Sequence, residues 1–211
     1  MEPWFVPPKM KQLAGTEVIN YGYDKQNTVR YSFNSLGFRS PEPVTTPSLV
    51  VVGNSISFGI GLDMSMTYGA ILSSKFNRSL DNRAFGCYFH ENHDHLSNID
   101  LLTQQDRDSI FVIQINNLDR RRQGENVLNG NDANWCVKRF LDFFDQAEHL
   151  LKHRPHKYIY WDDVNYSIPD SVKKMIFIKN QFQIDNSIAN NHGSVGPKSH
   201  FAIAKALSYV I

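Results

Sequence analysis

The chain has 211 residues, of which 41% are hydrophobic and 20% charged, a composition typical of a globular protein with a sizeable core. A formal net charge of +1 and one short basic run, Arg120–Arg122, argue against a dedicated nucleic-acid binder. No apolar run approaches the roughly 18 residues of a membrane span, and Met1–Pro8 lacks the parts of a signal peptide. We therefore expect a cytoplasmic or otherwise soluble protein with no membrane partner, in which Cys87 and Cys136 are reduced.

The predicted elements follow one another in an alternating order. Residues 1–45 are rich in Pro, Tyr and Asn and carry only short strand signals, so we expect an irregular arm packed on a single domain of residues 46–211. A spaced apolar face predicts a helix over residues 131–153. Strand-like runs lie at about 48–53, 79–83, 109–115, 157–161 and 175–179. This alternation predicts an α/β fold, a three-layer α/β/α sandwich with a mainly parallel central sheet.

The first strand of that domain leads directly into a serine. Its β-branched run is typical of a buried parallel strand, and Gly53 after it allows a sharp turn with exposed amide groups. Ser55 then lies at the carboxyl end of a strand, where ligands of open α/β sheets bind. It is a candidate nucleophile, although a serine here also fits a helix cap. The loop lacks the lysine of a P-loop, and Ser57 stands where a nucleophile elbow has glycine.

Five blocks in order resemble the SGNH (GDSL) hydrolase family over most of the chain. Gly53–Ser55 resembles its Gly-Asp-Ser block, with asparagine replacing the aspartate, and Asn34–Arg39 resembles the lead-in before it. The second, third and closing blocks are similar to Asn82–Gly86, Ile115–Leu118 and His192–Ala204. The resemblance implies a flavodoxin-like topology and ester hydrolysis by a serine nucleophile, without a cofactor or metal.

The same resemblance assigns the oxyanion hole. The Ser55 amide, the Gly86 amide and the Asn117 side chain would bind the negative oxygen of the tetrahedral intermediate. The third block lacks the family's glycine and final aspartate, so Asn116 stays an alternative to Asn117. We expect weaker substrate contacts from Asn54 and from Arg120, whose alternative is a surface arginine.

The general base and its partner are less clearly marked. We expect the base at His192, in a loop of small polar residues, with His200 at a helix start as the alternative. The family has an aspartate three residues before this histidine, but this chain has Ala189 there. Asp185 is our candidate triad acid, and Asp162 or Asp163 or a Ser-His dyad remain alternatives.

Three functions fit this pattern. The first is a serine esterase or carbohydrate O-deacetylase acting on a small-molecule or carbohydrate acyl ester. The second is a catalytically weak or inactive binding or structural module on the same scaffold, and the third is an acyltransferase. His90, Glu91, His93, Asp94 and His95 crowd together, but their spacing matches no metal motif, and we expect a solvated loop. The sequence leaves the oligomeric state open.

Overall fold

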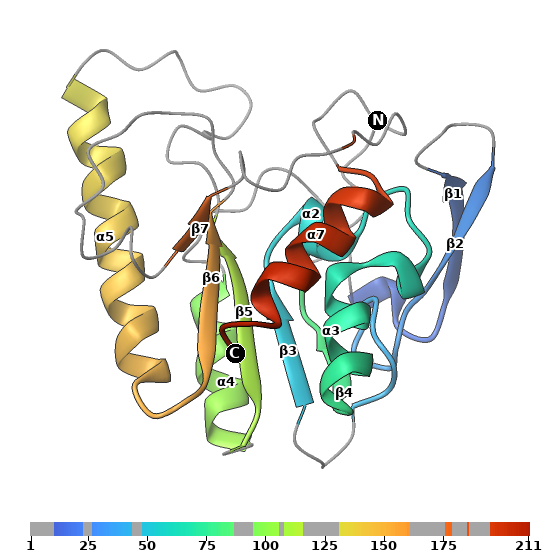
Figure 1. Ribbon diagram of the computed structural model, residues 1–211, viewed down its shortest axis with the longest axis horizontal. Coiled ribbons are helices and arrows are strands. Elements are labelled where there is room, and N and C mark those ends of the chain that lie inside the picture. Colours follow the sequence, from blue (N-terminus) through green and yellow to red (C-terminus); the bar gives the residue numbers. More distant parts are fainter. Residues whose placement is uncertain are drawn as a thin grey trace.

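The computed structural model describes residues 11–22, 27–43, 48–86, 95–105, 108–115, 131–160, 176–178, 185 and 195–211 (Figure 1). The strands are β1 (Glu17–Tyr21), β2 (Thr28–Ser32), β3 (Ser48–Val52), β4 (Ser79–Asn82), β5 (Ile110–Ile115), β6 (His156–Tyr160) and β7 (Ile176–Ile178). The α-helices are α2 (Ser55–Phe58), α3 (Tyr68–Phe76), α4 (Leu96–Gln105), α5 (Asn131–Leu151) and α7 (Pro197–Leu207). Two 3₁₀ helices are η1 (Lys11–Leu13) and η2 (Met64–Met66).

Five of the described strands form one parallel sheet in the order β4-β3-β5-β6-β7. Numbered by their place in the chain, these strands have the flavodoxin-like order, in which the first strand lies between the second and the third. The strand that follows β3 in the chain, β4, lies on one side of it, and the next strand, β5, lies on the other side. The topological switch point is therefore between β3 and β5. This sheet confirms the predicted α/β class.

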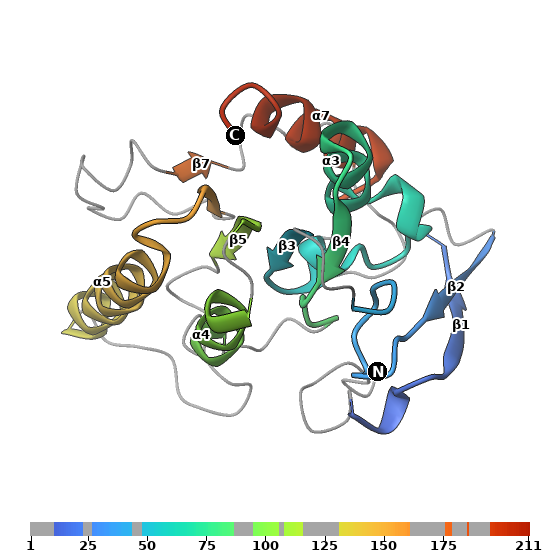
Figure 2. The same cartoon turned by 90° about the horizontal axis from the view of Figure 1, so that it is seen from below.

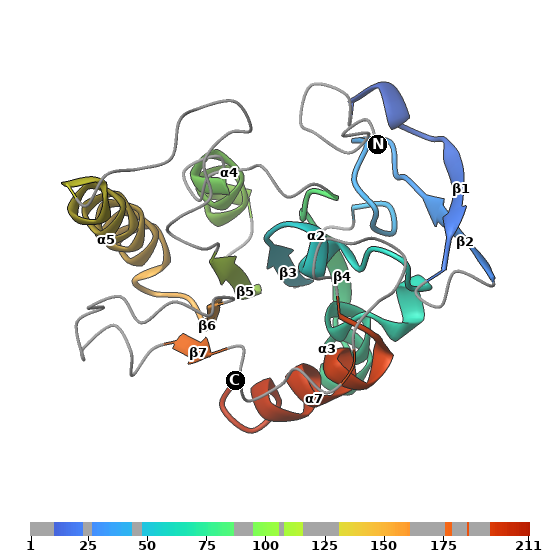
Figure 3. The same ribbon diagram turned by 90° about the horizontal axis from the view of Figure 1, so that it is seen from above.

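Helices cover both faces of the sheet (Figures 2 and 3). Side chains of β3 alternate between the two cores, as a strand's period of two requires. Val50 and Val52 pack in the cluster that includes α4 and α5 residues, and Leu49 and Val51 pack in the cluster that includes α3 and α7 residues. Every residue of β3 is buried, which explains why its sequence is apolar at each position from Leu49 to Val52 instead of alternating.

The predicted strands and the long helix match the observed elements to within two residues at each end. Ahead of the sheet, β1 and β2 form an antiparallel hairpin at the β4 side of the molecule (Figure 1). Tyr31 and Phe33 from this region are buried in a third cluster with Phe58 and Phe85. The division of the chain at residue 45 stays a prediction. Within the described ranges, no helix is long and apolar enough to cross a membrane.

Candidate active site

Ser55 lies at the switch point between β3 and β5. Gly53 and Asn54 separate it from the end of β3, and it is the first residue of the four-residue helix α2. Gly59 ends this helix with a φ of 76°, a left-handed conformation that favours glycine. The residue is 6% exposed, and none of the described residues forms a hydrogen bond with its hydroxyl. The sequence prediction of a serine at a sharp strand-to-helix turn is therefore confirmed as a position in the fold.

The carboxamide of Gln114, from β5, bridges the turn around Ser55. Its Oε1 accepts hydrogen bonds from the Asn54 amide at 3.3 Å, the Ser57 amide at 2.9 Å and the Ser57 hydroxyl at 2.6 Å. Its Nε2 donates to Asn54 Oδ1. Asn54 is fully buried and holds the turn together through this bond, and the substrate contact that we expect from it stays a prediction.

The close approach of Gln114 also explains Gly53. A Cβ at residue 53 would lie 2.6 Å from Gln114 Cβ and 2.9 Å from its Oε1, well inside van der Waals contact. Only glycine leaves room for the carboxamide here. The glycine before Asn54 therefore serves the packing of β5 against the turn.

The chain after β4 continues along the same turn as far as Gly86. The Arg83 amide donates to the Val51 carbonyl at 2.8 Å, and the Phe85 amide donates to the Gly53 carbonyl at 2.8 Å. Gly86 follows directly. Across the described part of the chain, the amides of Ser55 and Gly86 donate no hydrogen bond, so both remain available to an acceptor from outside.

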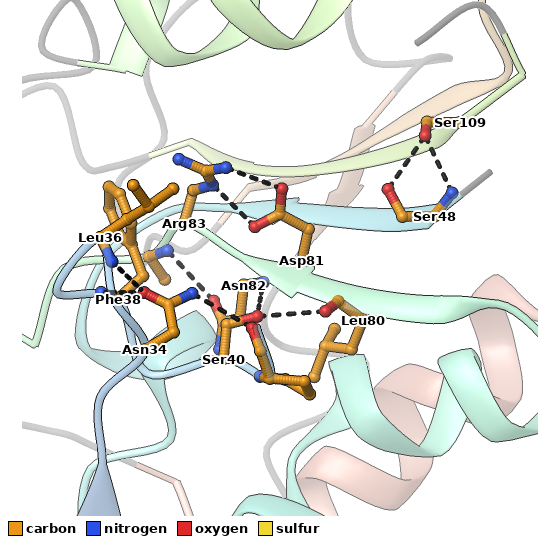
Figure 4. A network of polar contacts seen from close by, with 12 residues as sticks. Asn34, Leu36, Phe38, Ser40, Ser48, Leu80, Asp81, Asn82, Arg83 and Ser109 are labelled. Atoms are coloured by element: carbon orange, nitrogen blue, oxygen red, sulfur yellow. Dashed lines mark hydrogen bonds and ion pairs between the residues drawn. The ribbon is translucent and has the colours of Figure 1, made fainter. Parts of the chain in front are cut away.

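The lead-in segment is a closed loop built around the Asn34 side chain (Figure 4). Its Oδ1 accepts from the amides of Leu36 and Phe38, both at 3.0 Å, and its Nδ2 donates to the Pro41 carbonyl at 3.1 Å. This loop delivers Arg39 into the interior. Asparagine fits the position because both ends of its short amide bond the backbone that follows it.

Arg39 is 1% exposed and clamps the loop that follows α2. Its Nη1 donates to the carbonyls of Phe58 and Gly59, both at 2.8 Å, and its Nη2 donates to the carbonyl of Leu62 at 2.5 Å. The guanidinium carbon lies 4.3 Å from the centre of the Tyr31 ring. Burial lowers the pKa of Arg39 to about 10, so the clamp carries a desolvation cost.

His200 lies inside the layer formed by α3 and α7. It is 1% exposed, its Nδ1 accepts the Tyr68 amide at 3.0 Å, and its ring stacks on Tyr68 at 5.7 Å between centroids. Burial lowers its pKa to about 3, which agrees with a ring whose Nδ1 must stay unprotonated to accept. These contacts give His200 a structural role in holding α7 to α3.

Asp185 is tied to the first turn of α7. Its Oδ1 accepts the Ser199 amide at 2.8 Å and hydroxyl at 2.7 Å, and its Oδ2 accepts the Lys198 amide at 3.0 Å. Partial burial alone would raise the pKa of Asp185, but hydrogen bonds from Ser199 and Lys198 lower it overall. A carboxylate has about four acceptor positions, so one remains beside the three in use.

The other predicted site residues lie outside the described residues. These are the base His192, the amides Asn116 and Asn117, the cation Arg120 and the alternative acids Asp162 and Asp163. Of the acidic and histidine-rich segment only His95 is described; it is buried and stacks on Phe85 at 5.2 Å between ring centroids.

Sequence reasoning missed Gln114 and the role of Arg39. Gln114 stands near the end of an otherwise apolar strand whose described residues are all buried. A single polar residue in such a run is the signal that could have found it, because buried amides need partners. Arg39 carried no comparable signal, since its acceptors are backbone carbonyls.

No protein-family model and no curated protein matches the sequence. Among solved structures, the chain is similar to an acetyl xylan esterase from the rumen bacterium Butyrivibrio proteoclasticus, with 19% identity and a TM-score of 0.47. That match covers 80% of this chain and 64% of the esterase, less than two thirds of its length. It is also similar to a lipolytic protein of the G-D-S-L family from Desulfitobacterium hafniense, with 12% identity, a TM-score of 0.49, and coverage of 79% and 100%.

A further similar structure is a carbohydrate esterase whose active site displays divergent catalytic and non-catalytic binding functions, with 13% identity and a TM-score of 0.48. The match covers 80% of this chain and 69% of that one. The second of these structures is described as a member of the G-D-S-L family, the family that the motifs of this chain resemble. What those proteins bind or cleave is a property of those proteins.

Proposed function

We propose that this protein is a serine hydrolase that cleaves acyl esters through a Ser55 acyl-enzyme. The observation that carries the proposal is the position of Ser55. It lies at the switch point of a parallel sheet, and its own amide and that of Gly86 have no acceptor among the described residues. Ligands of such sheets bind at this place, and two unused amides beside a hydroxyl are the donors that a developing oxyanion needs.

The proposed reaction has two halves. Ser55 Oγ attacks the ester carbonyl carbon while its proton passes to the His192 imidazole, and the carbonyl oxygen becomes an oxyanion. The amides of Ser55 and Gly86, with the side chain of Asn117, donate to that oxygen. As the intermediate collapses, the alcohol leaves with the proton from His192. Water, activated by the same imidazole, then releases the acid and regenerates Ser55.

Asp185 is the acid that we propose for this histidine. It begins the segment that leads to the His192 loop, and one acceptor position of its carboxylate remains for an imidazole N–H. Its lowered pKa keeps it ionised at neutral pH, as the support of an imidazolium requires. The same bonds make Asp185 a cap of α7, so its substitution affects stability as well as turnover.

For the substrate we propose a small-molecule or carbohydrate acyl ester, with an O-acetyl group on a sugar as the first choice to assay. The family resemblance motivates this choice. An acyltransferase would use the same acyl-enzyme but pass the acyl group to an acceptor alcohol instead of water. Product analysis with an added alcohol separates these two reactions.

The test is Ser55→Ala, with Ser65→Ala as the matched control. Ser65 is an exposed serine on η2 that bonds Asp63, so its loss leaves the sheet edge untouched. Wild type and Ser65→Ala should hydrolyse an activated acetyl ester and react with a fluorophosphonate, and Ser55→Ala should do neither while keeping its melting temperature. An unlabelled wild type would point to a binding module, and an active Ser55→Ala protein would place the nucleophile elsewhere.

A further inference from the structure

A single glutamine joins the central strand of the sheet to both sides of the proposed nucleophile. Gln114 is 2% exposed, and its carboxamide reaches from β5 to Asn54, before Ser55, and to Ser57, after it. We propose that Gln114 is a positioning residue that fixes the backbone of Ser55 for catalysis. This inference rests on the proposed function.

The orientation of the carboxamide follows from its partners. Two backbone N–H groups, those of Asn54 and Ser57, point at one end of it, so this end is the oxygen. The nitrogen then faces Asn54 Oδ1 and donates to it. Both ends of the amide are thus satisfied by the same short turn, and a hydrophobic side chain of equal length could form none of these bonds.

The network continues in one direction. Since Gln114 Oε1 can only accept, the Ser57 hydroxyl donates to it, and the Tyr68 hydroxyl must donate to Ser57 Oγ over 2.5 Å. Burial raises the pKa of Tyr68, so its phenol keeps the proton that it donates. Hydrogen bonds among residues of β5, α2 and α3 therefore hold the turn in a single arrangement.

This arrangement decides which amides are left for substrate. Gln114 occupies the Ser57 amide, and the Asn54 carbonyl accepts the Phe58 amide at 2.8 Å. Asn82 holds the same turn from β4, because its Nδ2 donates to the Ser57 carbonyl at 3.1 Å. The Ser55 amide stays available while its neighbours are fixed, so hydroxyl and oxyanion donor are held together. Misplacing a reacting group by about 1 Å can cost roughly 100-fold in rate.

The experiment compares Gln114→Met with Ser109→Ala. Ser109 is a buried polar residue next to the other end of β5, and its hydroxyl binds the amide and hydroxyl of Ser48, both at 3.0 Å (Figure 4). Both substitutions remove buried hydrogen bonds across the same pair of neighbouring strands, but only Gln114→Met removes those at the turn around Ser55. For each protein, kcat and KM for an activated acetyl ester, the rate of fluorophosphonate labelling and the unfolding free energy are measured.

We expect Gln114→Met to lower kcat and the labelling rate by about 100-fold while KM changes less than about threefold. Ser109→Ala should lose stability and keep its kcat. If Gln114→Met keeps a wild-type kcat, or if both variants lose kcat together, Gln114 has no positioning role. Should Gln114→Met fail to fold, Ser57→Ala decides: about a tenfold loss of kcat supports the inference and an unchanged kcat overturns it.

Failure of the proposed function looks different. In that case wild type itself shows no labelling at Ser55, or Ser55→Ala retains hydrolysis, whatever Gln114→Met does. The positioning role would then fall together with the nucleophile.

Discussion

Replacing the buried guanidinium of Arg39 should open the loop that follows the proposed nucleophile. In Arg39→Met, a side chain of similar length keeps the apolar contact with Tyr31, but the carbonyls of Phe58, Gly59 and Leu62 lose the hydrogen bonds that Arg39 donates. The Gly59 carbonyl still accepts the Leu62 amide at 3.1 Å. Losing one such buried hydrogen bond costs about 1–3 kcal/mol. Three lost bonds at the low end of that range lower the unfolding free energy by about 3 kcal/mol. A larger loss is not expected, because the substitution also removes the desolvation cost of the buried cation, whose pKa is lowered to about 10.

Urea unfolding followed by circular dichroism measures this loss of unfolding free energy. Arg39→Lys should lose nearly as much, because one ammonium cannot match a planar fork that bonds three carbonyls and stacks on a ring. Arg30→Met is the control, because Arg30 pairs with Glu17 on the exposed hairpin. The urea midpoint of this variant should not differ measurably from that of the wild type. A loss below about 1 kcal/mol in Arg39→Met would refute the clamp.

Two further predictions concern the histidine and the third block. His200 has a folded pKa near 3 against an ordinary value of 6.5, so the unfolded chain takes up a proton first and stability falls as the pH drops from 6.5 towards 3. The loss should be roughly 1 kcal/mol per pH unit, and an equal acid dependence in His200→Gln would contradict this assignment. Asn117→Ala should lower kcat about 100-fold with a smaller effect on KM, as an oxyanion donor requires. If Asn116→Ala shows that loss instead, the block is shifted by one residue.

The sheet could be predicted because its strands are recognisable from short stretches of sequence. The run from Leu49 to Val52 is apolar at every position, and so is most of Ile110–Ile115, as strands buried on both faces must be. The order of strands and helices along the chain then leaves few ways to arrange a parallel sheet. The hairpin of β1 and β2 was harder, because its outer residues are exposed and its pattern is short.

The position of the candidate site could be predicted from the sequence, but most of the residues that support it could not. Ser55 follows from the glycine-flanked turn after a buried strand. Its supports follow less directly. Arg39 binds backbone carbonyls, which leave no trace in side-chain patterns. Gln114 stands out as a polar residue in an apolar strand, but the strand does not indicate which residues it bonds. Asp185 shows the same difficulty, because its partners at the start of α7 are mostly amides.

The turn around Ser55 and the helix after it are held by residues distant in the chain. The hydrogen bonds of Arg39 join residues 19 to 23 positions apart in the sequence, and those of Gln114 join residues 57 to 60 positions apart. The bond between His200 and Tyr68 spans 132 positions. Closing loops of such lengths costs chain entropy before any contact repays it. An intermediate with β3 and α3 formed therefore still lacks the final geometry at Ser55 until β5 docks beside β3. The geometry that the proposed reaction needs is therefore complete only after β5 has joined the sheet, later than β3, the strand that precedes Ser55.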